Sequence, residues 1–285
     1  MPQYKPLSFV GLTMFPTQTR IFLIIFFCLQ LSRLFGQSSE LGIFMGGSRY
    51  TGDLDPNFLS VKFIHPAGGL MYRHNWNPHY SWKGTVTYGT VSAADAGSSD
   101  PFMANRNLSF KSTLIEGSAQ IEFNFFPYEI GSLEYSGATP YVFTGFSGFY
   151  FNPKTEYNGS WYELQLLRTE GKAYSLISFA IPMGIGLKFR LGNFTMGVEA
   201  GARKTFTDHL DDVSATYFDQ NSLSGLAAVL ADRSVNADTS AILTSGRQRG
   251  TSSDKDWYTF AGIIISFKIS GKPRVNCESF EKKYY

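Results

Sequence analysis

Alternation of apolar with small or polar side chains dominates the sequence after residue 37. A period of two is that of a β-strand, and an amphipathic helix would instead repeat every 3.6 residues. The alternation is clear in four segments, at 113–125, 175–190, 194–206 and 257–269. Weaker alternation predicts four more strands at 40–50, 67–76, 81–92 and 138–151, the last with aromatic residues on both faces. We therefore expect an all-β fold of eight strands.

The sequence favours a membrane location for these strands. No apolar run after residue 37 reaches the roughly 20 residues that a helical span needs. A closed β-barrel is the other structure that crosses a bilayer, and bacterial single-chain barrels have an even number of strands. Only 17% of the residues are charged, against about 25% in soluble domains. A soluble β-sandwich or lipocalin-like barrel remains the alternative, because alternation does not show which face points inward.

The lengths of the connections support the barrel. Outer-membrane barrels have short periplasmic turns and long outer loops. If the first strand starts in the periplasm, the long connections are 51–66, 93–112, 152–174 and 207–256, and the short ones are 77–80, 126–137 and 190–193. Long and short connections thus alternate as the fold requires. We predict an eight-stranded antiparallel transmembrane barrel in the outer membrane, with both chain ends in the periplasm.

The first 37 residues have the pattern of a secretory signal. They contain Lys5, Arg20 and Arg33 but no acidic residue, and the short apolar run 21–29 follows Arg20. A basic start, a short apolar stretch and a small residue before a polar one predict cleavage. Met14 is an alternative start, since 14–20 alone would supply the basic region. We expect a cleaved signal at 1–37, a barrel at 38–270 and a periplasmic tail at 271–285.

The predicted barrel has polar and charged residues on the strand faces expected to point inward. An eight-stranded barrel is just wide enough for side chains to fill, so acids and bases there should pair. The alternative, an ion pathway, is disfavoured by this size. The predicted polar network of the lumen is Glu116, Gln120, Glu122, Lys188, Arg190, Glu199, Arg203 and Lys268.

The sequence gives no support for catalysis, a cofactor or nucleic-acid binding. The formal net charge is only +2, and no phosphate-binding glycine loop or G-x-S-x-G motif is present. Asp208, Asp211 and Asp212 could supply oxygen ligands for Ca²⁺, but they lack the spacing of a calcium loop, which favours a solvated acidic turn. A lipid-modifying enzyme is a weaker alternative, with His209 as its one candidate residue. We predict a protein that is not an enzyme and has no metal site.

The tail contains the candidate partner-binding residues Lys272, Arg274 and Cys277. Removal of the signal leaves Cys277 as the single cysteine, and an unpaired cysteine in an oxidising compartment suggests an intermolecular disulfide or a reactive thiol. The alternative is a tolerated free thiol in a mobile tail.

Short stretches in order along the chain resemble the PorG-type outer-membrane proteins of the type IX secretion system of the Bacteroidota. His209 departs from the Tyr expected at its position in the most specific stretch, 206–214. The stretches are Tyr50–Asp53, Arg106–Phe110, Thr139–Tyr141, Phe151–Pro153, Thr169–Gly171, Ile181–Gly184, Phe206–Ser214, Leu230–Ser234, Arg249–Gly250 and Asp256–Tyr258.

This resemblance implies a structural, non-catalytic barrel that is not itself the secretion channel. It also implies association with a periplasmic ring of PorK/PorN-like subunits. We expect that contact through turn 126–137 and the tail 271–285, with a disulfide from Cys277 as one form of it. The alternative is a stand-alone barrel for adhesion or membrane stabilisation that acts through its long outer loops.

Overall fold

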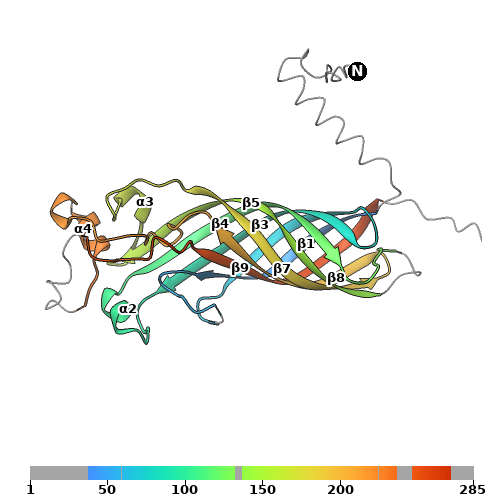
Figure 1. Cartoon of the computed structure of the whole chain (residues 1–285), viewed down its shortest axis with the longest axis horizontal. Helices are drawn as coiled ribbons and strands as arrows, with labels where there is room; N and C mark the ends of the chain where they lie inside the picture. Colours follow the sequence, from blue (N-terminus) through green and yellow to red (C-terminus); the bar gives the residue numbers. More distant parts are fainter. Residues whose placement is uncertain (1–37, 59, 132–136, 224, 236–245, 271–285) are drawn as a thin grey trace, which may run out of the picture. The chain divides into compact units, whose positions relative to one another are not determined.

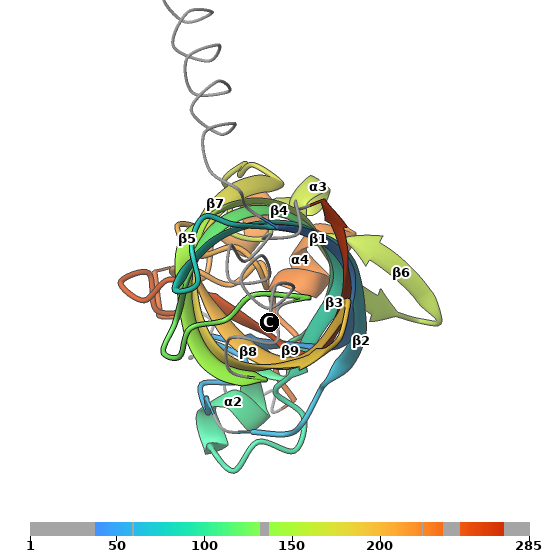
Figure 2. The same ribbon diagram turned by 90° about the vertical axis from the view of Figure 1, so that its right-hand side faces the viewer.

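Eight strands close into an antiparallel barrel in the computed structural model. The model describes residues 38–58, 60–131, 137–223, 225–235 and 246–270. Within these residues the sheet order is β4-β3-β2-β1-β9-β8-β7-β5-β6, and pairing of β4 with β5 closes the ring (Figure 2). The short β6 (Ser160–Glu163) pairs only with β5 and lies outside the ring. The barrel strands are β1 (Ser39–Thr51), β2 (His65–Asn75), β3 (Tyr80–Ala94), β4 (Ser109–Asn124), β5 (Ala138–Tyr157), β7 (Ile177–Leu191), β8 (Phe194–Thr205) and β9 (Trp257–Ser270).

The predicted fold class is confirmed, and each predicted strand overlaps one strand of the barrel. Apolar side chains point outward: Ile43, Leu70, Ile121, Ile185 and Val198 are all exposed on their strands. The alternating partners on the same strands face the lumen and are largely buried. A soluble barrel would have the reverse arrangement, so the soluble alternative is wrong. An outward apolar band on a closed barrel is the surface that a bilayer covers.

The barrel has a loop end and a turn end. The loop end contains the long connections 52–64, 95–108, 158–176 and 206–256, and the turn end contains 76–79, 125–137 and 192–193. Gly192 has a φ of 65°, a conformation that glycine adopts without steric cost in the two-residue turn between β7 and β8. Strand β1 begins and β9 ends at the turn end, as the predicted topology requires.

The helices of the barrel lie at the loop end (Figure 1). They are α2 (Pro101–Arg106), α3 (Leu164–Leu167), α4 (Leu226–Ala231) and the 3₁₀ turn η1 (Gln220–Ser222). Among the described residues, no helix has the length and apolar character to span a membrane.

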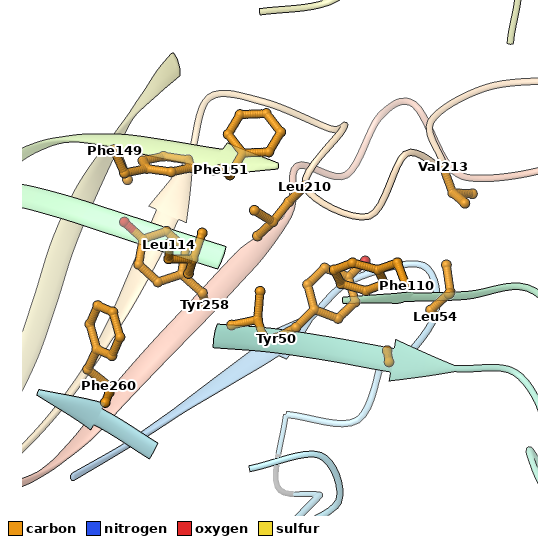
Figure 3. Close-up of a cluster of buried hydrophobic side chains, with 14 of the residues drawn as sticks. Tyr50, Leu54, Phe110, Leu114, Phe149, Phe151, Leu210, Val213, Tyr258 and Phe260 are labelled. Atoms are coloured by element: carbon orange, nitrogen blue, oxygen red, sulfur yellow. The ribbon is translucent and has the colours of Figure 1, made fainter. Parts of the chain in front are cut away.

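Strand β5 settles the orientation that its sequence left open. Tyr141, Phe143, Phe149 and Phe151 point into the lumen, whereas Phe146 points outward and stacks on Phe179. Inward rings need space, and glycines provide it. A Cβ at residue 186 would lie 2.3 Å from the Tyr141 ring. Nearer the loop end, the rings of Phe149, Phe151 and Tyr258 belong to a buried apolar cluster that also contains Leu210 and Val213 of the last loop (Figure 3).

Candidate functional site

Glu122 is the centre of a buried ion-pair network in the lumen. Its carboxylate contacts Arg73 at 2.9 Å, Lys83 at 3.1 Å and Lys188 at 2.5 Å. Arg73 also donates to Glu40 at 2.9 Å, and Lys83 pairs with Glu199. All of these side chains are almost fully buried. The network joins strands from opposite sides of the ring and fills the barrel near the turn end.

A second ion pair lies nearer the loop end. Arg203 contacts Glu116 at 3.2 Å, and Tyr258 donates to the same carboxylate at 2.7 Å. Gln120 lies between the two networks and donates to Ser118. The structure thus places five residues of the predicted set in two groups. Glu122, Lys188 and Glu199 belong to the first network, and Glu116 and Arg203 form the second pair.

Two predicted lumen residues lie at the rim instead. Arg190 and Lys268 are only half-buried, and they donate to the backbone carbonyls of Glu129 and Ile130. Both carbonyls belong to the connection after β4. Tyr128 of this connection is buried and bonds Thr195, and its backbone N–H donates to Pro78. Residues 127–131 therefore plug the turn end.

Three network members, Glu40, Arg73 and Lys83, were not predicted from the sequence. They lie on β1, β2 and β3, whose alternation is weakest because glycines and short polar residues occur on both faces. Strand pairing gives a usable signal for two of them, since Arg73 is directly opposite Glu40, and opposite charges in register across neighbouring strands would have identified this pair. Lys83 gives no such signal, because the residue opposite it on β2 is the like-charged Arg73.

Two buried arginines connect all four long connections at the loop end. Arg106 of α2 makes a two-point contact with Asp95, at 2.7 and 2.8 Å, and donates to the carbonyls of Asp53 and Arg249. Arg249 donates to Glu170 at 2.9 Å and to the carbonyls of Asp212 and Ala231. We call Asp53, Asp95, Arg106, Glu170, Asp208, Asp211, Asp212, Arg249 and Asp256 the loop-end cluster.

The expected solvated acidic turn at 208–212 is wrong. Asp208, Asp211 and Asp212 are 4%, 1% and 2% exposed. The Tyr50 hydroxyl lies 2.5 Å from Asp211 and 3.0 Å from Asp256, and the Tyr174 hydroxyl donates to Asp212 at 2.7 Å. These carboxylates accept hydrogen bonds that fix the loop to the barrel. Among the described residues, no group of ligating side chains is arranged to hold a metal ion.

His209 stacks on Tyr174, with ring centroids 4.5 Å apart, so its ring packs against the loop-end cluster. Lys272, Arg274 and Cys277 lie outside the described residues, as does the signal region 1–37.

Comparison with known proteins identifies a family. A family model described as a domain of unknown function, DUF6089, matches residues 19–227. The chain belongs to this family. A search of curated proteins gives no match.

Solved structures of small outer-membrane barrels are similar in fold. Ail, the attachment invasion locus protein of Yersinia pestis, has 12% identity and a TM-score of 0.39, with 82% of this chain and 100% of that chain covered. Neisserial surface protein A has 8% identity and a TM-score of 0.39, covering 82% and 98%. The N-terminal barrel domain of Pseudomonas aeruginosa OprF has 12% identity and a TM-score of 0.33, covering 81% and 98%. The fold assignment itself rests on the strand pairing of this chain.

The protein is an outer-membrane β-barrel. Its strands close into a ring through the pairing of β4 with β5, its outward face is apolar, and its charges are gathered inside or at the ends. These are the properties that a chain needs to cross a bilayer with strands.

The filled lumen predicts that the barrel does not conduct. Rings, ion pairs and the 127–131 segment occupy the interior, and an eight-stranded barrel has no spare cross-section. Protein reconstituted in a planar bilayer should show no stable channel openings in 1 M KCl. Persistent steps of a size typical of porins would contradict the packed lumen.

The loop-end cluster should weaken as the pH rises. Burial raises the pKa of Asp208 and of Asp212 to about 6, and burial with the nearby Asp256 carboxylate raises the pKa of Asp211 well above its usual range. A carboxyl whose pKa is higher folded than unfolded contributes stability below about pH 4, and this is lost as the pH rises through the folded value.

Proteinase K cleavage of the folded barrel tests this dependence. Loop 206–256 should be cut more slowly at pH 5 than at pH 8, after correction for protease activity on an unstructured peptide. Asp208→Asn should remove part of the difference, because the pKa of Asp208 lies between these two pH values and an amide does not titrate there. Equal protection at both pH values in the wild type would show that these carboxyls do not titrate with loop opening.

Proposed function

We propose that this barrel is a non-catalytic structural component of a type IX protein secretion machine. It would anchor or organise the machine's periplasmic ring at the outer membrane. The observation that carries the proposal is the convergence of the stretches that resemble PorG-type proteins. Asp53, Arg106, Glu170, Asp212 and Arg249 come from five separate stretches and meet in the loop-end cluster. Residues whose contacts hold the loops together fit a structural role.

The turn end is the side from which a periplasmic ring would be reached. There Phe125 and Phe126 are 52% and 54% exposed, directly before the plugging segment 127–131. We propose that PorK/PorN-like ring subunits contact this surface and the tail residues Lys272, Arg274 and Cys277, with a disulfide from Cys277 as one form of the contact. The packed lumen supports a role as an anchor and not as the conduit.

Affinity purification from outer membranes tests this proposal. A loop-end affinity tag should recover the ring subunits with the wild-type chain and lose them when 271–285 is deleted. On a non-reducing gel, Cys277→Ser should abolish any band that shifts on reduction. Recovery of no periplasmic subunit with the intact chain would overturn the anchoring role, whatever the state of Cys277.

A second candidate is a stand-alone barrel that acts through its outer loops. The observation that favours it is a groove of about 1040 Å³ at the loop end, between the first, second and last long connections. If the loops carry the function, deletion of 271–285 should leave cell adhesion and outer-membrane stability unchanged. Shortening loop 52–64 should abolish the one that the barrel provides.

A further inference from the structure

The groove at the loop end begins where the outward apolar face of β8 and β9 ends. Outward pairs run from Phe194 opposite Phe267 through Val198 opposite Ile263 to Lys204 opposite Trp257. Lys204 is ten residues beyond Phe194 along β8, and with a rise of about 3.4 Å per residue and a tilt of about 40° this is about 26 Å of height. The apolar band of such barrels is about 25 Å tall. Lys204 therefore stands at the level of the lipid headgroups.

Aromatic and basic groups line the groove at this level. The Lys204 ammonium lies 5.7 Å from the centre of the Trp257 ring, and Phe58 packs edge-on against that ring at 5.9 Å. Lys255 also lines the groove. Within the described residues, neither Lys204 nor Lys255 forms a salt bridge, so both ammonium groups keep donors for an anion.

The lining also offers hydrogen-bond acceptors. Asp100, which caps the N-terminus of α2, and Asp254 both face the groove. Carboxylates would repel a simple anionic headgroup, but they accept hydrogen bonds from sugar hydroxyls. The flat ring of Trp257 suits the apolar face of a sugar. A groove that combines lysines, aromatic rings and carboxylates therefore suits one class of ligand, a sugar that also carries phosphate.

We propose that this groove binds the phosphorylated sugar headgroup of a lipid in the outer leaflet. Lys204 and Lys255 contact phosphate, and Asp100 and Asp254 accept from hydroxyls. Trp257 and Phe58 pack on the ring, while the acyl chains lie along the apolar face of β8 and β9. This inference is independent of the proposed secretion role, since it concerns the loop end and needs no periplasmic partner.

Native mass spectrometry of the barrel released from nanodiscs tests the site. The discs contain phosphatidylcholine with 10% of a glucosamine-disaccharide lipid that bears two phosphates. The wild type should retain one such lipid. Lys204→Gln with Lys255→Gln should lower its apparent affinity about 10-fold or more, the scale expected when charge-assisted contacts are lost.

Lys111→Gln is the matched control. The Lys111 ammonium also lies over a tryptophan, 5.8 Å from the centre of Trp161, but it is outside the groove. All three substituted lysines are exposed or lie in loops, and heat-modified gel mobility checks that each variant is folded. Equal lipid retention by the double variant and the wild type would overturn the proposal, as would an equal loss with Lys111→Gln.

Two further probes distinguish the sugar lipid from other ligands that carry phosphate. Phosphatidylglycerol in place of the sugar lipid should be retained weakly, and equal retention would overturn recognition of the sugar. Millimolar glucose 1-phosphate in solution should not displace the lipid. Displacement would show a site for free sugar phosphates, which contradicts a lipid site.

Discussion

Glu122→Gln should destabilise the folded barrel by about 3–5 kcal/mol, the usual cost of removing one partner from a buried ion-pair network. Glu122 faces Arg73, Lys83 and Lys188 inside the lumen. Without its charge, three buried cations are left with Glu40 and Glu199 as the remaining carboxylates of the network. Urea titration of reversible folding into lipid vesicles, followed by heat-modified gel mobility, measures the change.

Glu163→Gln is the matched control for this substitution. Glu163 pairs with Lys154 at 2.8 Å outside the barrel, and both side chains are 39% exposed. An exposed pair contributes about 0–1 kcal/mol, so this variant should unfold close to the wild type. Adding Lys188→Met to Glu122→Gln should recover part of the loss, because it removes one uncompensated cation. Similar midpoints for Glu122→Gln and Glu163→Gln would contradict the central place given to Glu122.

Arg249→Met should release the last long loop while leaving the barrel folded. Arg249 is 2% exposed, and it ties Glu170, Asp212 and the end of α4 together. Losing it leaves buried carboxylates without a cation, at a cost of about 3–5 kcal/mol, or a rise of at least 100-fold in loop opening. Proteinase K should therefore cut within 206–256 at least about 100-fold faster, provided that opening precedes cleavage.

Arg168→Met provides the comparison, since Arg168 is exposed on the neighbouring loop. It should leave the cleavage rate of 206–256 unchanged. Heat-modified gel mobility should be normal for both variants, because the strands do not depend on Arg249. If Arg249→Met left the loop as resistant as the wild type, the loop-end cluster would not be what holds it.

The strands could be predicted from the sequence because membrane barrels impose a strict local rule. Each outward residue meets lipid and each inward one meets the lumen, so Ile121 and Glu122 alternate whatever their distant neighbours are. Where both faces of a strand carry side chains of similar polarity, alternation no longer shows which face points inward. The faces of β5 were undecided because rings occur on both, and only the glycines opposite, such as Gly186, show where rings fit.

The loop-end cluster could not be derived in the same way. Its members come from connections far apart in the chain, and nothing local shows that Arg249 meets Glu170. Three aspartates within five residues look like a solvated turn, since isolated carboxylates are rarely buried. Burial follows only when Tyr50, Thr169 and Arg249 are brought to them by closure of the barrel. The resemblance of the stretches identified these residues without indicating that they touch.

Cysteine labelling in intact cells tests most directly how this barrel crosses the outer membrane. Single cysteines at Lys172, exposed at the loop end, and at Asn193, exposed at the turn end, would be placed in a Cys277→Ser background. An impermeant maleimide should label Lys172→Cys in intact cells and Asn193→Cys only after the outer membrane is permeabilised. Labelling of Asn193→Cys in intact cells, with Lys172→Cys protected, would contradict the orientation on which both the periplasmic anchor and the headgroup site depend.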